Sequence, residues 1–532
     1  MIKIYNKIKN NKKLFIVFII SLTLLSSFNL FHKGIILSHD INFHLHRILA
    51  LTDNLRIHKY IPVYYNYLDG FGYGNGLFYP DTFLFIPAVL NYLGINLEIS
   101  YKMFIILINF LSLLTMYLCV IKITKKKYCA YTSMILYACS IYRLIDLVER
   151  GSLGENLAFI FIPLVILGLY EILYGKHEKN IFLALGLIGL CLSHVISLYL
   201  MCISLVIIVL INIKCLKDKK RLLTLIFNII ISMLITSFFW LPMLEQIFSN
   251  DFNFMINSSD FNRNVIPFIA LFIDFPLVNM FKVWVPSGIG LVYYYGIYKY
   301  FRLRIKDKFL LSIYVVGILS IIMASFKLLW KIDIFNTIFS IIQFPWRFYM
   351  ISTSFLIIGL SILSKKFSKN SIKFIIIYTI VFFIGNSLLY TYNAYFEEPF
   401  NDEIMMGEYL PKNFDFEAIN GYKNKNITFK RNKEVTEIEI KKKKETIETP
   451  LIYYKGYKAC SDKCYDIYKT EKGLLGIKVN NELGTINVKY EGTQLQKVSK
   501  YISLASIGIM VIYLKSKKGK QIEKVLQKSF EQ

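Results

Sequence analysis

The sequence predicts a polytopic α-helical membrane protein with a β-rich domain outside the cytoplasm, and three observations lead to this fold class. First, 55% of the 532 residues are hydrophobic and 16% are aromatic, which is too apolar for a chain whose whole surface meets water. Second, apolar stretches long enough to cross a bilayer recur along the chain. Third, residues 391–499 lack such stretches and instead alternate short β-type runs with turn residues.

Twelve segments are predicted to span the membrane, since a transmembrane helix needs about 20 apolar residues. They are 14–31, 101–121, 128–146, 155–174, 178–193, 195–213, 221–244, 286–301, 309–326, 346–364, 371–390 and 500–514. Residues 178–213 are predicted to form a hairpin, because one continuous helix would be about 54 Å long against a hydrocarbon core of about 30 Å. The apolar segment 79–94 is predicted to lie in the interface or to re-enter.

Basic runs orient these spans, because Lys and Arg in short loops stay cytoplasmic. Seven runs fall on one side of the predicted topology: 3–13, 122–127, 176–179, 214–221, 302–308, 365–373 and 515 onward. The chain is then expected in the cytoplasmic (plasma) membrane with both termini inside. The outer segments are 32–100, 147–154, 245–285, 327–345 and 391–499. The net charge of +26 is therefore assigned to cytoplasmic loops, and no nucleic-acid partner is expected.

Three regions follow from this topology: a transmembrane domain over 1–390, an extracytoplasmic domain over 391–499, and a last span with a basic cytoplasmic tail over 500–532. Short β-rich runs predict a small β-sandwich in the middle region. These runs are 427–432, 435–440, 451–459, 474–479 and 485–490. Cys460 and Cys464 lie there four residues apart, a spacing that fits a disulfide and two free thiols equally well.

The first outer loop, 32–100, holds the main candidates for catalysis. Asp40 comes just before a predicted helix over 41–58, at its N-cap, and His44 and Arg47 follow at positions able to face the same way. A carboxylate beside an imidazole and a guanidinium suits acid–base or phosphate chemistry. An Asp at an N-cap often serves only as the cap. Five of the seven His residues lie between 32 and 58, and this clustering favours a functional site.

Four other residues are candidate substrate contacts at the outer rim of the bundle. Tyr73 and Tyr79 belong to the glycine-rich stretch 70–80, where a ring either stacks on a sugar or only anchors the loop in the interface. His194 lies in the turn of the short hairpin, where it either lines a hydrated recess or only ends a helix. Arg347 begins a span from the outside and either binds a lipid phosphate or extends towards the headgroups.

The second outer loop brings Glu149, Arg150 and Glu155, with Asp146 before them, between two spans. Charges next to hydrocarbon are costly and usually functional. Asp40 with Glu149 or Glu155 would supply the oxygen ligands that Mg²⁺ or Mn²⁺ prefer. The alternative is an ordinary hydrated loop in which Arg150 pairs with a Glu, and the sequence leaves both open.

A set of motifs follows in order along almost the whole chain, at 39–47, 72–74, 78–80, 150–155, 344–347, 407–411 and 453–459. The acid in the first outer loop, the acidic second loop and the short hairpin look like the GT-C class of membrane glycosyltransferases. The motif order more narrowly resembles bacterial YfhO-type membrane proteins and the related family labelled after 6-pyruvoyl-tetrahydropterin synthase. No residue here gives a basis for pterin chemistry.

The resemblance implies sugar transfer from a polyprenyl-phosphate donor to a surface glycan or teichoic-acid-like acceptor on the outer face of the membrane. Asp40 matches the catalytic first-loop acid. Glu155, or less closely Asp146 or Glu149, matches a second-loop acid that some members use for metal. Ile41 follows Asp40 where some subclasses have a second acid, so base and metal ligand both stay open for Asp40.

In the implied mechanism the donor phosphate meets Arg47, Arg150 or Arg347. Asp40 then deprotonates the acceptor hydroxyl or holds the metal ion. One alternative is a transporter or flippase of lipid-linked glycans, which would need ionisable groups at mid-membrane. Another is a non-catalytic envelope assembly protein whose β domain binds partners.

Overall fold

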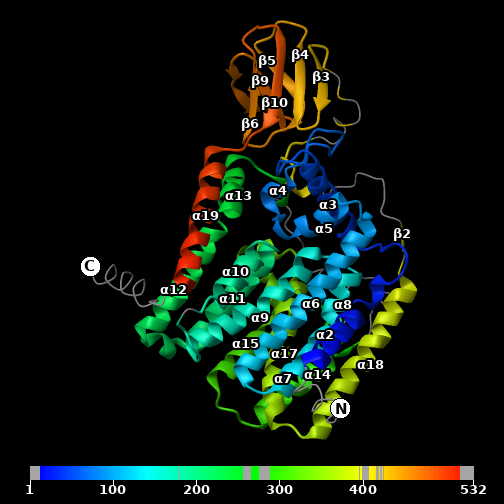
Figure 1. Cartoon of the computed structure of the whole chain (residues 1–532), viewed down its shortest axis with the longest axis vertical. Helices are drawn as coiled ribbons and strands as arrows, with labels where there is room; N and C mark the ends of the chain where they lie inside the picture. The colour runs from blue at the N-terminus through cyan, green and yellow to red at the C-terminus, as the bar shows by residue number, and fades with distance from the viewer. Residues whose placement is uncertain are drawn as a thin grey trace.

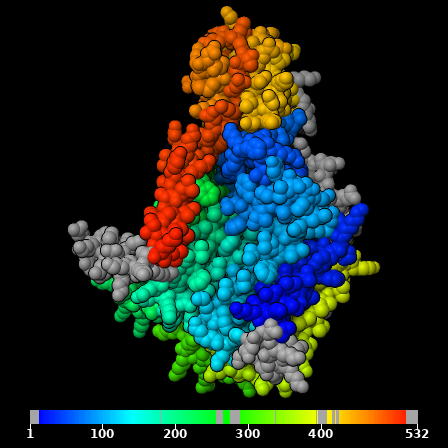
Figure 2. All heavy atoms as spheres, viewed as in Figure 1, coloured from blue at the N-terminus to red at the C-terminus, as the bar shows by residue number. Residues whose placement is uncertain are grey.

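A helical body and a β domain make up the computed structural model of the chain, with the β domain at one end of the longest axis (Figure 1). The structure describes residues 12–178, 180–255, 265–274, 288–394, 396–397, 407–414, 419, 422 and 424–515. The first outer loop lies between the helical body and the β domain (Figure 2).

Six of the described helices are long and apolar enough to cross a membrane. They are α6 (Leu97–Thr124), α9 (Leu153–Leu173), α15 (Lys308–Ser325), α17 (Phe348–Leu363) with its flanking turns, α18 (Lys369–Asn393) and α19 (Gln494–Lys515). The pair α12 (Lys219–Ile235) and α13 (Ser237–Ser249), bent by 67°, makes a seventh if it is one span. The protein is therefore a polytopic helical membrane protein with six or seven candidate spans among its described residues.

The predicted count of twelve spans is not reached, because several apolar segments form shorter helices. These are α2 (Lys12–Ser26), α7 (Lys127–Ala138), α8 (Ile141–Val148), α10 (Phe182–Cys191), α11 (Val195–Ile211) and α14 (Leu291–Arg302). The predicted span 128–146 is broken at Ser140, whose hydroxyl accepts a hydrogen bond from the amide of Arg143 and starts a new helix. At 1.5 Å per residue, α10 is about 15 Å long, roughly half the hydrocarbon thickness. Which side of the membrane each terminus occupies stays a prediction.

The first outer loop folds as two short layers over α6. Helix α3 (Ile41–Arg56) confirms the helix predicted over 41–58. The apolar segment 79–94 forms a 3₁₀ turn and α5 (Phe85–Tyr92), which pack against α3 and α6 and are too short to span. Asn96 starts α6 with a side chain that accepts a hydrogen bond from the Glu98 amide at 2.7 Å. The loop thus packs on the helical bundle as a layer of short helices and turns.

Among the described residues, eight short strands form the β domain in two antiparallel sheets. They are β3 (Ile427–Asn432), β4 (Val435–Ile440), β5 (Thr446–Ile452), β6 (Tyr457–Cys460), β7 (Cys464–Tyr465), β8 (Ile467–Lys469), β9 (Leu474–Lys478) and β10 (Gly484–Tyr490). The orders are β3-β4-β10-β6-β7 and β5-β9-β8. Four of the five predicted strands are confirmed. The fifth, 451–459, is divided at Gly456, whose φ of +125° favours glycine, and its halves belong to different sheets.

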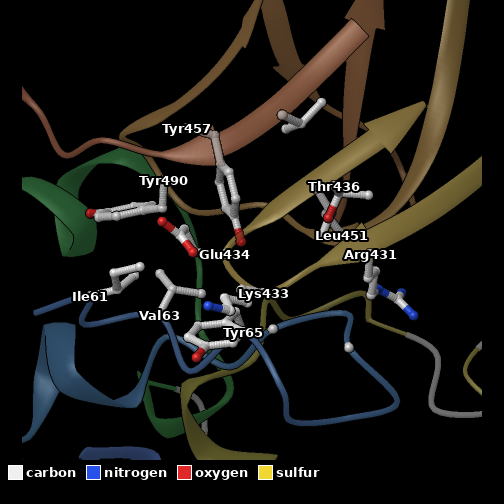
Figure 3. A pocket seen from close by; sticks show the side chains of 13 residues that line it. Ile61, Val63, Tyr65, Arg431, Lys433, Glu434, Thr436, Leu451, Tyr457 and Tyr490 are labelled. Carbon is white, nitrogen blue, oxygen red and sulfur yellow. The ribbon is translucent and has the colours of Figure 1, made fainter. Parts of the chain in front are cut away.

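The domain shares an apolar core with the first outer loop. Ile452 donates its amide to the carbonyl of Phe71 at 2.9 Å, and the ring of Tyr454 packs directly against Gly74. A crevice at this junction is lined by Tyr65 from the loop and by Tyr457 and Tyr490 from the domain, among others (Figure 3). The contact is continuous with the core of both parts, so the β domain is docked on the loop that carries Asp40.

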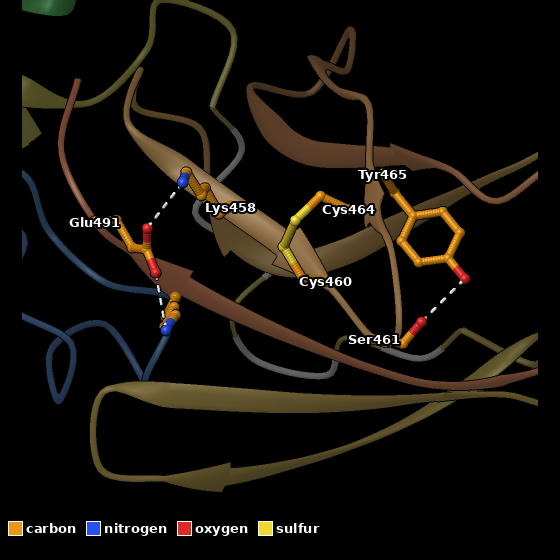
Figure 4. Close-up of a disulfide and its surroundings, with 7 residues drawn as sticks. Lys458, Cys460, Ser461, Cys464, Tyr465 and Glu491 are labelled. Atoms are coloured by element: carbon orange, nitrogen blue, oxygen red, sulfur yellow. Dashed lines mark hydrogen bonds and ion pairs between the residues drawn. A yellow bond between two sulfur atoms is a disulfide. The ribbon is translucent and has the colours of Figure 1, made fainter. Parts of the chain in front are cut away.

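The predicted candidate disulfide is present. Cys460 and Cys464 are bonded across the β6–β7 hairpin (Figure 4). Nearby, Glu491 pairs with Lys458 at 3.0 Å and with Lys489 at 2.8 Å. Disulfides persist in oxidising compartments, which agrees with the predicted extracytoplasmic position of this domain.

Candidate active site

The first and second outer loops are joined by backbone hydrogen bonds just where the candidate residues lie. The amide of Asp40 donates to the carbonyl of Arg150 at 2.8 Å, and the amide of His39 donates to the carbonyl of Glu149 at 3.2 Å. Gly151 follows with a φ of +58°, and a Cβ there would collide with Ser38 Oγ. Glycine is therefore required for the two loops to approach this closely.

Asp40 stands at the N-cap of α3 as predicted, but its side chain makes no capping hydrogen bond. Its carboxylate is 26% exposed, and Oδ2 lies 4.0 Å from Nη2 of Arg150. A capping role would have used the carboxylate on the first-turn amides. Asp40 instead presents a partly open carboxylate beside a cation.

Arg150 is the centre of a buried charge cluster below Asp40. Its Nη1 lies 2.7 Å from Oε1 of Glu155 and 2.8 Å from Oδ1 of Asp146, and these three side chains are at most 3% exposed. The guanidinium stacks over the ring of Trp346 at 4.1 Å. Buried charges persist only when they are paired in this way. The cluster therefore holds the guanidinium of Arg150 in a fixed position next to Asp40.

Arg347 extends the cluster from the start of α17. Its Nε lies 3.1 Å from Oε1 of Glu155, and its Nη1 donates to Gln343 Oε1 at 2.7 Å. Tyr142 donates to the other oxygen of Glu155 at 3.1 Å. Sequence reasoning missed Tyr142. The signal available was its position four residues before Asp146, which puts both on one face of α8.

His44 is buried, with both ring nitrogens facing donors. The amide of Leu153 donates to Nε2 at 3.2 Å, and Nη1 of Arg47 lies 3.3 Å from Nδ1. Burial, and then the charge of Arg47, lowers the pKa of His44 well below its usual value. His44 is thereby held neutral, which suits a positioning residue between α3 and α9 better than a proton acceptor.

Arg47 is engaged in the scaffold of the first loop. Its Nη2 donates to Oδ1 of Asp81 at 3.0 Å and to the carbonyl of Pro80 at 2.7 Å. The guanidinium lies over the ring of Tyr79 at 4.1 Å, and its side chain is 1% exposed. Of the three arginines predicted to meet a phosphate, Arg47 is therefore the least accessible, while Arg150 and Arg347 lie next to Asp40 and Glu155.

His194 and Tyr79 meet at the start of α9. A Cβ on Gly154 would collide with the hydroxyl of Tyr79 and would lie 3.1 Å from Cδ2 of His194. The two rings are 6.0 Å apart, and Nδ1 of His194 is 2.7 Å from Oγ of Ser197. The structure thus brings His194 and Tyr79 to Glu155. Tyr73 is fully buried at the junction with the β domain, where its hydroxyl accepts a hydrogen bond from the amide of Tyr409 at 3.3 Å.

The three predicted metal ligands Asp40, Glu149 and Glu155 do not converge. Glu149 bonds through its side chain to Tyr390 of α18, and both oxygens of Glu155 are engaged by Arg150, Arg347 and Tyr142 in the contacts described above. In the part of the chain that the structure describes, no three His, Cys, Asp or Glu side chains form a group able to hold a metal ion. These donors do not fit Mg²⁺ or Mn²⁺ well, since each cation needs free oxygen ligands.

Together, the fold and the site define a multi-pass membrane protein in which the loops 32–100 and 147–154 meet at a buried charged site near a β domain. The family model described as "6-pyruvoyl-tetrahydropterin synthase related domain; membrane protein" matches residues 77–396. Because the match covers more than half of the chain, the protein belongs to this family of membrane proteins. A search of the curated proteins gives no match.

Among solved structures, the chain is similar to arabinofuranosyltransferase AftD from Mycobacteria, with a TM-score of 0.43 and 13% sequence identity. The similarity covers 72% of this chain and 27% of that one. The chain therefore corresponds to little more than a quarter of AftD in length, and a likeness this distant says nothing about activity.

Proposed function

We propose that the protein transfers a sugar from a polyprenyl-phosphate donor to a cell-surface glycan or polymer on the outer face of the cytoplasmic membrane. The observation that carries the proposal is the environment of Asp40. Its carboxylate heads α3 without capping it, is partly open to solvent and lies over a buried charge cluster. A carboxylate that caps no helix and lies beside buried, paired charges at the end of membrane spans points to chemistry. The resemblance of the first-loop acid, the acidic second loop and the short hairpin to the GT-C class supplies the reaction type.

In this proposal Asp40 is the general base. The acceptor hydroxyl attacks the anomeric carbon, the bond from that carbon to the phosphate oxygen breaks with inversion, and polyprenyl phosphate leaves with the bonding electrons. Asp40 takes the hydroxyl proton. Because its side chain is 26% exposed, Asp40 can pass that proton to water before the next turnover.

Arg347 is the proposed contact for the donor phosphate. It begins the candidate span Pro345–Lys366, so its guanidinium lies at the end of a membrane-spanning helix, the depth at which the phosphate of a membrane lipid lies. Arg347 and Arg150 are held in place by Glu155 and Asp146, and fixed cations stabilise the charge that develops on a leaving phosphate.

The surroundings of Glu155 suit the sugar of the donor. Tyr79 and His194 both border Gly154 at the start of α9, and aromatic and imidazole rings stack on sugar faces. Because Gly154 has no side chain, the rings of Tyr79 and His194 can both lie close to the backbone at this position. We infer that they orient the donor sugar towards Asp40.

A test in cells does not require the sugar to be identified in advance. Cells lacking the gene are complemented with the wild-type protein, with Asp40→Asn, or with the control Asp53→Asn, which changes a half-buried carboxylate on the same helix. The wild type and the control should restore the sugar missing from the envelope polysaccharide, and Asp40→Asn should not, at equal protein levels in the membrane. Full restoration by Asp40→Asn would refute the proposed role.

A further inference from the structure

The segment 407–412, which leads towards the β domain, is held against the first outer loop by hydrogen bonds and ring contacts. The carbonyls of Gly407 and Leu410 accept hydrogen bonds from the side chain and the backbone amide of Asn253, at 2.9 and 3.0 Å. Tyr454 of the β domain donates its hydroxyl to the carbonyl of Tyr409 at 3.0 Å. The segment is therefore held on both sides by parts of the chain far from it in sequence.

Tyr409 fixes the segment next to the residues of the site. Its ring stacks on Phe78 with centroids 5.3 Å apart and an interplanar angle of 2°, and its amide donates to the hydroxyl of Tyr73 at 3.3 Å. Phe78 precedes Tyr79, whose hydroxyl packs against Gly154, the residue before Glu155 of the charge cluster. The turn Gly407–Tyr409 thus lies directly above the wall of the candidate site.

Glu408 lies at the centre of this turn, and its side chain is half-buried. The charges of Arg347 and Asp40 both act on its carboxyl group. Burial raises the pKa of Glu408, the cation of Arg347 partly offsets this, and the carboxylate of Asp40 adds to it. The packing of Tyr409 on Phe78 and the hydrogen bond from Tyr454 place this turn between the β domain and the candidate site, where the charges of Arg347 and Asp40 act on Glu408.

We propose that Glu408 completes the site from the side of the β domain and, together with Asp40, binds the hydroxyl groups of the sugar unit that accepts the transferred sugar. The proposal rests on the proposed function, which supplies a hydroxylated acceptor. Two carboxyl groups on either side of a bound sugar can each accept a hydrogen bond from one of its hydroxyl groups, and such bonds to charged groups are strong. The acceptor then enters beneath the β domain, and the donor reaches Arg347 from the membrane.

A purely structural role for Glu408 makes a different prediction. If its carboxylate only held Arg347 in place, its removal would change the donor KM or the stability and leave the acceptor KM unaltered. If it binds the acceptor, the acceptor KM changes and the donor KM does not. The separation of the two KM values therefore distinguishes the two roles.

The experiment uses the purified full-length protein in lipid nanodiscs. Undecaprenyl-phosphate derivatives of glucose, galactose, mannose and N-acetylglucosamine serve as donors, and the methyl glycosides of the same sugars serve as acceptor probes. Glu408→Gln should raise the acceptor KM about tenfold or more, as loss of a hydrogen bond to a charged group predicts, with the donor KM and kcat changed less than about twofold. Glu408→Asp should recover part of the loss. The control Glu439→Gln changes an exposed carboxylate on β4 and should behave as wild type.

Binding of the methyl glycosides, followed by tryptophan fluorescence without a donor, separates this inference from the proposed function. Weaker binding to Glu408→Gln than to wild type supports the inference even if the wild type transfers no sugar, in which case only the proposed function fails. Transfer by the wild type with an unchanged acceptor KM in Glu408→Gln overturns the inference and leaves the function standing. Absence of glycoside binding to the wild type also overturns the inference.

Discussion

Replacing Arg150 by Met should destabilise the protein more than any other change of a single charge in the outer loops. Met keeps much of the side-chain volume but leaves Asp146 without its cation and Glu155 with Arg347 alone. Arg150 lies 2.7 and 2.8 Å from these two buried carboxylates. Breaking a buried pair by removing one partner costs about 3–5 kcal/mol, and loss of the stacking on Trp346 adds about 1 kcal/mol. Denaturant titration of the purified protein in detergent micelles measures the loss.

Two variants make this measurement decisive. Arg56→Ala removes an ion pair at the surface, whose partners at 2.9 Å are 63% and 24% exposed, and should cost less than about 1 kcal/mol. Adding Glu155→Gln to Arg150→Met removes one uncompensated carboxylate and should recover at least about 1 kcal/mol relative to the sum of the single changes. A loss for Arg150→Met no larger than that for Arg56→Ala would refute the buried cluster.

Three other predictions follow from the structure. The lysines beside Glu491 lower its pKa to about 2, so its stabilising effect is present above about pH 4.5 and disappears as the pH falls towards 2. Glu491→Gln should therefore cost less than about 1 kcal/mol at pH 7 and nothing near pH 2 in thermal unfolding. Mass spectrometry should find Cys460 and Cys464 alkylated only after reduction, and alkylation of both without reduction would contradict the disulfide. Gly154→Ala should displace Tyr79, cost about 1–3 kcal/mol and abolish transfer. The control Gly385→Ala, where the added methyl meets open space in the interior of α18, should leave transfer unchanged and raise stability by at most about 1 kcal/mol.

Local patterns predicted the parts of the fold that depend on neighbours in sequence. The helix after Asp40 follows from the run at 41–58, and β3 and β4 match their predicted residues. The number of spans was not predictable in this way, because hydropathy does not show where a helix breaks. Ser140 interrupts an apolar stretch by starting a new helix, and one serine in such a stretch changes mean hydropathy very little.

In the candidate site, too, features set by neighbouring residues were predicted, and contacts between segments distant in sequence were not. Asp40 and Glu155 were found because each charge adjoins a span, and charges there are rare. The burial of Arg47 against Asp81 and the approach of Glu408 to Arg347 and Asp40 depend on packing between distant segments. No periodicity in a single sequence encodes such contacts.

The most direct test of the central claim measures sugar transfer by purified Asp40→Asn protein. Asn has nearly the same size as Asp, and the native side chain makes no capping bond that could be lost, so the variant should fold and unfold as the wild type does. An amide cannot accept the proton of the acceptor hydroxyl, so kcat should fall about 100-fold or more, with the donor KM little changed. Transfer from an undecaprenyl-phosphate sugar at the wild-type rate by a folded Asp40→Asn protein would contradict the role of Asp40 and the proposed mechanism with it.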